Sequence, residues 1–178
     1  ILLIISVFLL NTATAQTCIP GAGQSTSKPQ FVLHANGTAT DITTGLTWAR
    51  CVMGQRWNGK SCDKFKQVAS YRDWDNAIKD ARRSEFAGFT DWRLPSVDEL
   101  RTIVDDRCEN PSINSKVFPN TFPGPHWTSD SYKSSQVYAW RISFEDGSEN
   151  ADLKLVTSYV GRGVRGFMKV KKVKEVYE

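Results

Sequence analysis

The sequence predicts an α+β domain: an antiparallel β-sheet with two core helices, stabilised by disulfides. Three observations support this fold class. Short apolar runs bounded by turn residues occupy both ends of the chain, two segments with helical periodicity lie between them, and the number of cysteines is even. Strands that precede and follow a pair of helices, without regular strand–helix alternation, are typical of α+β domains.

The first fifteen residues are expected to be a secretory signal. Residues 1–10 are apolar except for Ser6, and Ala13-Thr14-Ala15 has the small-x-small pattern of a signal-peptidase site. The apolar run is shorter than the roughly 20 residues that a membrane-spanning helix needs. We therefore expect export to the periplasm or to the cell surface, with no membrane segment after signal removal. The alternatives are a retained membrane anchor and a lipoprotein anchored at Cys18.

The remaining chain is expected to form one domain. Residues 16–30 read as a leader coil, residues 31–168 as the domain and residues 169–178 as a basic tail. The length of this chain suits a single hydrophobic core.

Four cysteines in an exported chain predict two disulfides, for which three connectivities are possible. Cys51 and Cys62 flank Asn58-Gly59, a strong hairpin signal, so a bond between them would close that hairpin. Cys18 would then pair with Cys108 and tie the leader to the domain. The alternative is a zinc site, but the sequence has no Cys-x-x-Cys pair.

In the first half of the domain, we expect strands at 31–33, 38–42 and 46–51, separated by turns at Asn36-Gly37 and Thr44-Gly45. A helix is predicted from Trp74 to Arg83. Asp73 can cap this helix, and one apolar face carries Trp74, Ala77, Ile78 and Ala81.

The second helix is predicted from Val97 to about Asp105. Ser96 and Glu99 form a capping box, in which each side chain bonds a backbone amide of the other residue. Pro95 favours extended backbone at the preceding residue and stops the helix from starting earlier.

The last third is expected to be strand and loop, with strands at 127–129, 137–144, 149–155 and 164–167. Four of the six tryptophans fall at core positions of the expected elements: Trp48, Trp74, Trp92 and Trp140.

Two kinds of residue are candidates for a ligand surface. Trp57 and Trp127 lie in or beside loops, where exposed rings could stack on a sugar, although burial is favoured for both. The tail clusters ammonium groups that would attract sulfate or phosphate, although a solvated tail without a ligand is favoured. Its lysines are Lys169, Lys171, Lys172 and Lys174. Nucleic acid is not expected as a partner of an exported chain.

No catalytic residue, cofactor or metal is expected. The chain has two histidines, and its adjacent acids (105–106 and 145–146) fall where we place helix ends and turns. The segment 146–152 only weakly resembles a calcium-binding loop, which needs alternating oxygen ligands around a central glycine. A carboxylate-based hydrolase would need Asp91, Glu99 or Asp106 within about 5–9 Å of a second carboxylate.

The segment DWRLPSVDEL is interpreted as a structural signature. Trp92 and Leu94 are expected to pack, while Pro95, Ser96 and Glu99 end a strand and start a helix. Arg93 has no purely local role, so we expect a buried ion pair with Asp91 or Asp98.

An ordered series of motifs resembles the Lcl C-terminal domain family, a family of exported bacterial domains. The series consists of Thr44-Gly45-Leu46-Thr47-Trp48, Trp74-x-x-Ala77, Gly88-Phe89-Thr90-Asp91-Trp92-Arg93-Leu94-Pro95 with Glu99-Leu100, Phe118-Pro119, Trp127-Thr128-Ser129, Ala139-Trp140 with Phe144 and Gly147, and Val164-Arg165. The match covers nearly the whole chain after residue 30, and Cys51, Cys62 and Cys108 fit the disulfide-bearing members.

The resemblance implies a compact domain similar to C-type-lectin-like folds and implies no enzyme. Collagen-fused members are regarded as surface adhesins for sulfated polysaccharide, but this chain has no Gly-x-y repeat. The calcium-binding motifs of sugar-binding C-type lectins are also absent, so calcium-dependent lectin activity is not expected.

The predicted function is therefore an exported, non-enzymatic binding or adhesion module. Its partner would be a polyanionic glycan or an envelope protein, and its oligomeric state stays open. The alternatives are a periplasmic carboxylate-based hydrolase and a purely structural envelope protein.

Overall fold

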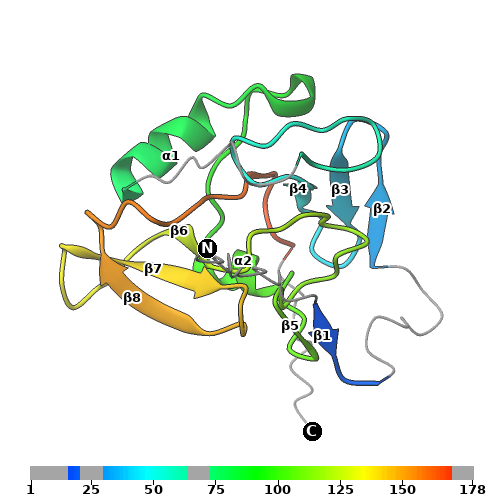
Figure 1. Ribbon diagram of the computed structural model, residues 1–178. Coiled ribbons are helices and arrows are strands. Elements are labelled where there is room, and N and C mark those ends of the chain that lie inside the picture. Colours follow the sequence, from blue (N-terminus) through cyan, green and yellow to red (C-terminus); the bar gives the residue numbers. More distant parts are fainter. Residues whose placement is uncertain (1–15, 21–29, 64–72, 170–178) are drawn as a thin grey trace, which may run out of the picture.

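In the part of the chain that the structure describes, the strands form three small antiparallel sheets, accompanied by two α-helices (Figure 1). The computed structural model describes residues 16–20, 30–63 and 73–169. The predicted α+β class is confirmed, but the strands divide among three sheets and do not form one. The predicted signal, residues 1–15, lies outside the described residues. Within the described part of the chain, no helix is long and apolar enough to cross a membrane.

The four-stranded sheet joins the beginning of the domain to its end. Its order is β2 (Phe31–Leu33), β3 (Thr38–Asp41), β4 (Thr47–Ala49) and β9 (Val164–Arg165). The register pairs Trp48 of β4 with Val164 of β9. The last strand of the sequence, β9, therefore pairs beside the meander formed by the first strands of the domain, β2 to β4.

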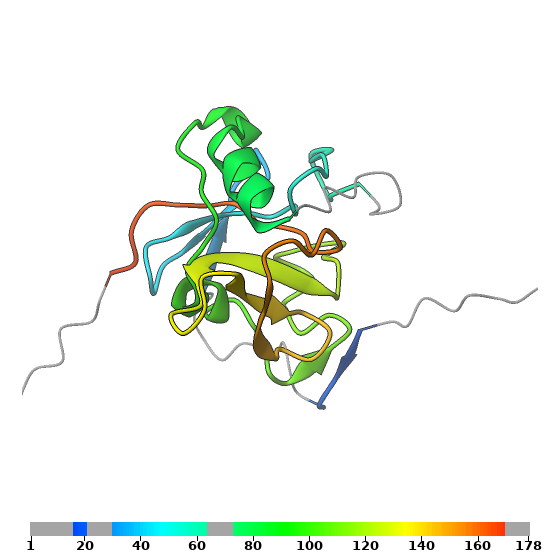
Figure 2. The same ribbon diagram turned by 90° about the vertical axis from the view of Figure 1, so that its left-hand side faces the viewer.

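The three-stranded sheet lies between the two helices. It consists of β6 (Pro125–Ser131), β7 (Tyr138–Ser143) and β8 (Glu149–Leu153), in that order. Figures 1 and 2 show α1 (Trp74–Arg82) on one side of this sheet and α2 (Val97–Arg101) on the other. The alternation of side chains along β7 explains this arrangement. Ala139 packs in the cluster of α1, and Ile142, on the opposite face, packs in the cluster that contains Leu100 of α2.

Both predicted helix caps are confirmed. The Asp73 side chain accepts a hydrogen bond from the Asn76 amide, and Ser96 and Glu99 form the complete capping box. However, α2 ends at Arg101 and not near residue 105. Ile103 nevertheless reaches the core from the turns that follow α2, where it is 4% exposed.

Both predicted disulfides are formed. Cys51–Cys62 closes the hairpin around Asn58-Gly59, where the Asn58 amide donates to the Ser61 carbonyl oxygen. Cys18–Cys108 connects two short paired strands, β1 (Thr17–Cys18) and β5 (Cys108–Glu109). We expected the leader to be coil, and two-residue strands such as β1 carry no periodicity that would reveal them.

A short 3₁₀ helix (Phe86–Gly88) precedes the DWRLPSVDEL segment and was not predicted. The Trp92 indole nitrogen donates a hydrogen bond of 2.9 Å to the Phe86 carbonyl oxygen. This contact fixes the buried Trp92 ring below the 3₁₀ turn.

Candidate functional site

The DWRLPSVDEL segment joins β9 to α2 through several hydrogen bonds of Arg93. Arg93 and Val164 exchange backbone hydrogen bonds of 3.0 Å, so the segment adds a bridge beside β9. The Arg93 guanidinium donates two hydrogen bonds of 2.7 Å to the Glu99 carboxylate and a third, also 2.7 Å, to the Gly166 carbonyl oxygen.

The predicted partner of Arg93 was wrong. We expected Asp91 or Asp98, but Asp91 pairs with Arg165, at 2.7 Å, and Asp98 lies on the exposed side of α2. Glu99 is the partner because the third residue of a capping box turns its side chain back towards the cap, where Arg93 lies. The Arg93 pair is only partly buried, since the side chain of Arg93 is 33% exposed and that of Glu99 is 8% exposed.

Glu99 is held in its charged form by its neighbours. Burial raises the pKa of its carboxyl, but hydrogen bonds from Arg93 and from the Ser96 amide outweigh burial, so the pKa lies below its ordinary value. The hydrogen bond to Glu99 likewise raises the pKa of Arg93. These contacts fasten a strand to a helix.

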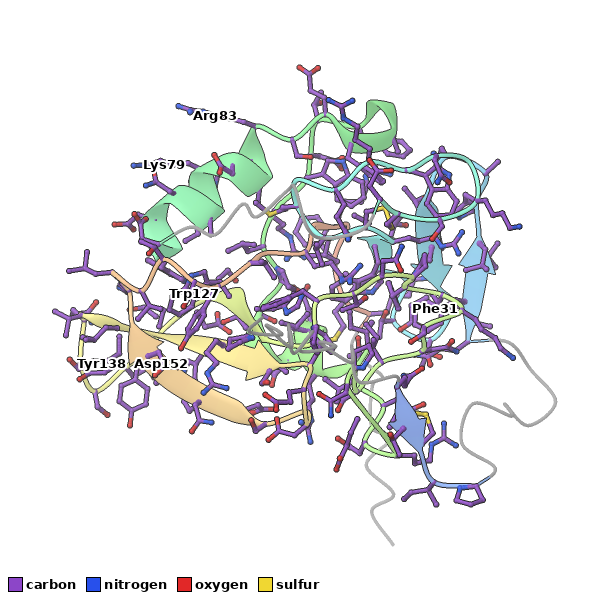
Figure 3. All side chains as sticks on the ribbon, in the orientation of Figure 1. Phe31, Lys79, Arg83, Trp127, Tyr138 and Asp152 are labelled. Atoms are coloured by element: carbon purple, nitrogen blue, oxygen red, sulfur yellow. A yellow bond between two sulfur atoms is a disulfide. The ribbon has the colours of Figure 1, made fainter. Side chains whose placement is uncertain are left out.

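The two tryptophans expected on a ligand surface do not meet there. Trp127 of β6 is fully buried on the α1 side of the three-stranded sheet, with its ring 4.7 Å from that of Tyr159, so the burial favoured from the sequence is confirmed (Figure 3). Trp57 is half-buried: its indole nitrogen donates to the Ala35 carbonyl oxygen, and Arg50 lies 4.4 Å from the centre of its ring. Both rings are engaged in contacts within the domain.

An aromatic groove lies instead beside the N-terminal end of α2. It has a volume of about 570 Å³. Trp140 of β7 and Tyr132 of the β6–β7 turn form its aromatic wall, with ring centroids 5.3 Å apart in an edge-to-face arrangement. The other lining residues are mainly polar: Val97, Asp98, Ser129, Asp130, Ser131, Lys133 and Glu149.

Trp140 was expected in the core, but it is half-buried. The prediction was right that Trp140 shares a face of β7 with Ile142, which is fully buried. The two residues differ in burial because of tertiary structure. The core around Leu100 covers the Ile142 end of this face and leaves Trp140 at the edge of α2. The aromatic wall could have been suspected from the close spacing of Tyr132, Tyr138 and Trp140 around a polar turn.

Two of the carboxylates in the groove are held in place. An oxygen of Asp130 accepts a hydrogen bond of 2.7 Å from the Val97 amide at the start of α2. Glu149 lies 3.5 Å from Arg101, which is also 3.5 Å from Asp106. The groove therefore has a fixed polar rim beside its aromatic wall.

The carboxylates considered for a hydrolase are each bound to a cation. Asp91 contacts Arg165, Glu99 contacts Arg93 and Asp106 contacts Arg101. Within residues 16–20, 30–63 and 73–169, no group of three or more His, Cys, Asp or Glu side chains is arranged to hold a metal ion.

His126 and Arg162 form a buried polar pair. Burial, reinforced by the positive charge of Arg162, lowers the pKa of His126 to about 3, and burial lowers the pKa of Arg162 to about 9. Arg162 donates to the carbonyl oxygens of Ala49 and Arg50 and to the Thr121 hydroxyl. His126 packs edge-to-face on Phe144. Through these contacts, His126 and Arg162 connect segments of the core.

The predicted basic tail is described only at Lys169, which is exposed. Lys171, Lys172 and Lys174 lie outside the described residues. Another group of exposed cations is Lys79 and Arg82 on α1 and Arg83 at its C-cap. Figure 3 shows Lys79 and Arg83 pointing away from the body of the molecule.

The fold is thus that of a small, disulfide-stabilised α+β domain. The profile of the Lcl C-terminal domain matches residues 37–165, and the chain belongs to this family. No curated protein matches the chain.

Proposed function

We propose that this protein is an exported, non-enzymatic binding or adhesion module whose ligand is a glycan held in the groove of Tyr132 and Trp140. The observation that carries the proposal is the aromatic pair that walls a groove of about 570 Å³. Ligand-binding clefts have volumes of about 300–1,000 Å³ and combine apolar surface with a few placed polar groups.

A sugar ring suits this combination. Its C–H face carries partial positive charge and can stack on the electron-rich face of an indole, while its hydroxyls need hydrogen-bond acceptors and donors at the edge. Asp130, Glu149 and the hydroxyls of Ser129 and Ser131 supply polar groups around Trp140. An envelope protein is the other partner that the sequence leaves open, and the polar rim around a narrow aromatic wall favours the glycan.

The proposal includes export of the chain and similarity of its fold to C-type-lectin-like domains. Two formed disulfides are compatible with an oxidising compartment, and the segment 1–15 has the pattern of a secretory signal. The family resemblance implies a likeness to C-type-lectin-like folds, and this likeness would place the domain among modules that bind ligands.

The test is a binding screen with the purified mature chain, residues 16–178. Immobilised neutral and sulfated polysaccharides are probed with the native chain and with Trp140→Ala. We expect binding to at least one polysaccharide, weakened about tenfold in Trp140→Ala because a stacking contact worth about 1 kcal/mol or more is lost. Phe167→Ala is the control, since Phe167 is 88% exposed and lies outside the groove.

Absence of binding to any polysaccharide, or equal binding by Trp140→Ala to every polysaccharide that the native chain binds, would contradict the proposal. Circular dichroism of each variant establishes that loss of binding does not reflect loss of fold.

A further inference from the structure

The groove continues on the other side of Trp140. A second hollow of about 420 Å³ shares Tyr132, Trp140 and Glu149 with the first. Its remaining lining residues are Ser135, Tyr138, Asn150 and Ala151. The two hollows therefore meet at one aromatic wall and lie along the β7–β8 hairpin.

The cross-strand pairing explains why the second hollow exists. Trp140 of β7 lies directly opposite Ala151 of β8. Directly opposed side chains are close neighbours on a sheet, so a small alanine leaves space beside the indole that a larger residue would fill. Tyr138, two residues before Trp140, projects from the same face of β7 and adds a second aromatic ring at the far end.

The charges of the lining disfavour an anionic ligand. Asp98, Asp130 and Glu149 face the first hollow, against the single cation Lys133. In the second hollow, Glu149 is the only ionisable acid and no cation is present among the lining residues. A sulfate or carboxylate on the ligand would meet like charge, and like-charge contacts exclude the wrong partner.

We propose that the two hollows bind an uncharged glycan chain of at least two sugar rings, which lies across Trp140 with one ring in each hollow. This inference rests on the function proposed above and specifies its ligand class. The site recognises an internal stretch of a neutral polysaccharide, because the two hollows share the wall formed by Tyr132, Trp140 and Glu149. A single terminal sugar would fill only one of them.

The test is isothermal titration of the mature chain with oligomers of glucose, mannose and N-acetylglucosamine, from one to six rings long. We expect affinity for the preferred sugar to rise at least fivefold from one ring to two or three rings, and then to level off. Heparin oligosaccharides of the same lengths should bind no more strongly to the native chain than to Trp140→Ala.

Two variants separate the hollows. Tyr138→Ala removes the far aromatic ring, and Ala151→Leu fills the space beside Trp140. Both should abolish the gain from the second ring, whereas affinity for the single sugar should stay within twofold. Tyr138 is 36% exposed, so its truncation acts at the surface. Phe167→Ala should match the native chain at every length.

The outcomes distinguish the two proposals. A single sugar that binds as tightly as its oligomers, or a length dependence that survives both variants, overturns the two-ring site while the glycan-binding function stands. Preferential, Trp140-dependent binding of heparin oligosaccharides overturns the neutral ligand class alone. Failure of every neutral and sulfated oligomer to bind overturns the proposed function as well.

Discussion

Arg93 and Glu99 join the start of α2 to the C-terminal end of the domain. Two hydrogen bonds of 2.7 Å connect their side chains, and the same Glu99 carboxylate accepts the Ser96 amide at 2.9 Å. Arg93 also reaches the Gly166 carbonyl oxygen. One carboxylate thereby completes a helix cap and fixes the cation that holds the segment after β9.

The Arg93–Glu99 pair should contribute more to the free energy of unfolding than the more exposed Arg165–Asp91 pair. Glu99→Gln removes a largely buried charge partner of Arg93, and we expect a loss of about 2 kcal/mol in the free energy of unfolding, below the range for a fully buried pair because Arg93 is one-third exposed. Urea denaturation measures this loss.

Asp91→Asn is the matched control for Glu99→Gln. It removes a carboxylate that also binds an arginine in two hydrogen bonds, of 2.7 and 3.0 Å, but Asp91 is 57% exposed. Its cost should stay below about 1 kcal/mol. Equal losses in the two variants would contradict the stabilising role assigned to Glu99.

His126 should make the domain sensitive to mild acid. The pKa of His126 is about 3 in the folded chain and about 6.5 when unfolded, so the unfolded chain binds more protons between these values. The stabilising effect is complete above pH 6.5 and is lost as the pH falls towards 3. We expect the free energy of unfolding to be about 2 kcal/mol lower at pH 5 than at pH 8.

His126→Phe provides the control for this pH dependence. A phenyl ring cannot titrate, and it can keep the edge-to-face contact with Phe144. The slope between pH 6.5 and 5 should then flatten, because carboxylates with lowered pKa values, such as Glu99, act at lower pH. An unchanged slope in urea denaturation at pH 8, 6 and 5 would refute the assignment to His126.

The two disulfides should differ in their contribution to stability. Cys18–Cys108 spans a sequence separation of 90 and Cys51–Cys62 spans 11. By loop entropy alone, replacing both cysteines with serine should cost about 4.5 kcal/mol for the long loop and about 3 kcal/mol for the short one. Thermal unfolding of the two double variants measures the order, and a larger loss for Cys51–Cys62 would contradict it.

The basic tail should control retention on heparin. Removing residues 169–178 deletes four lysines, so we expect the shortened chain to elute at lower salt than the full mature chain. Identical weak elution of both chains would contradict a polyanion-binding tail. Lys79→Ala with Arg83→Ala is the control, because it removes exposed cations from α1 and leaves the tail intact.

The local structure of this domain could be predicted well because local signals determine it. Asp73 and Ser96 mark helix starts by cap chemistry, and Asn58-Gly59 marks a turn by its backbone preference. The site could not be predicted in the same way. Trp140 was expected in the core but lines a groove, because burial depends on which helix covers which part of the sheet, and no short stretch of sequence contains that information.

The choice of ion-pair partners failed for a related reason. Asp91, Asp98 and Glu99 all lie within six residues of Arg93, so distance along the chain does not distinguish them. The direction of each side chain decides the pairing, and Arg165 of β9, far along the chain, takes up Asp91.

The position of β9 also sets the order in which the domain can be completed. A chain is made from its N-terminus, so β2, β3 and β4 emerge long before their fourth neighbour. The strand pairing of Trp48 with Val164 can form only after Val164 has been synthesised. The same holds for the backbone hydrogen bonds between Arg93 and Val164. The four-stranded sheet therefore cannot be completed until almost all residues of the domain have been synthesised.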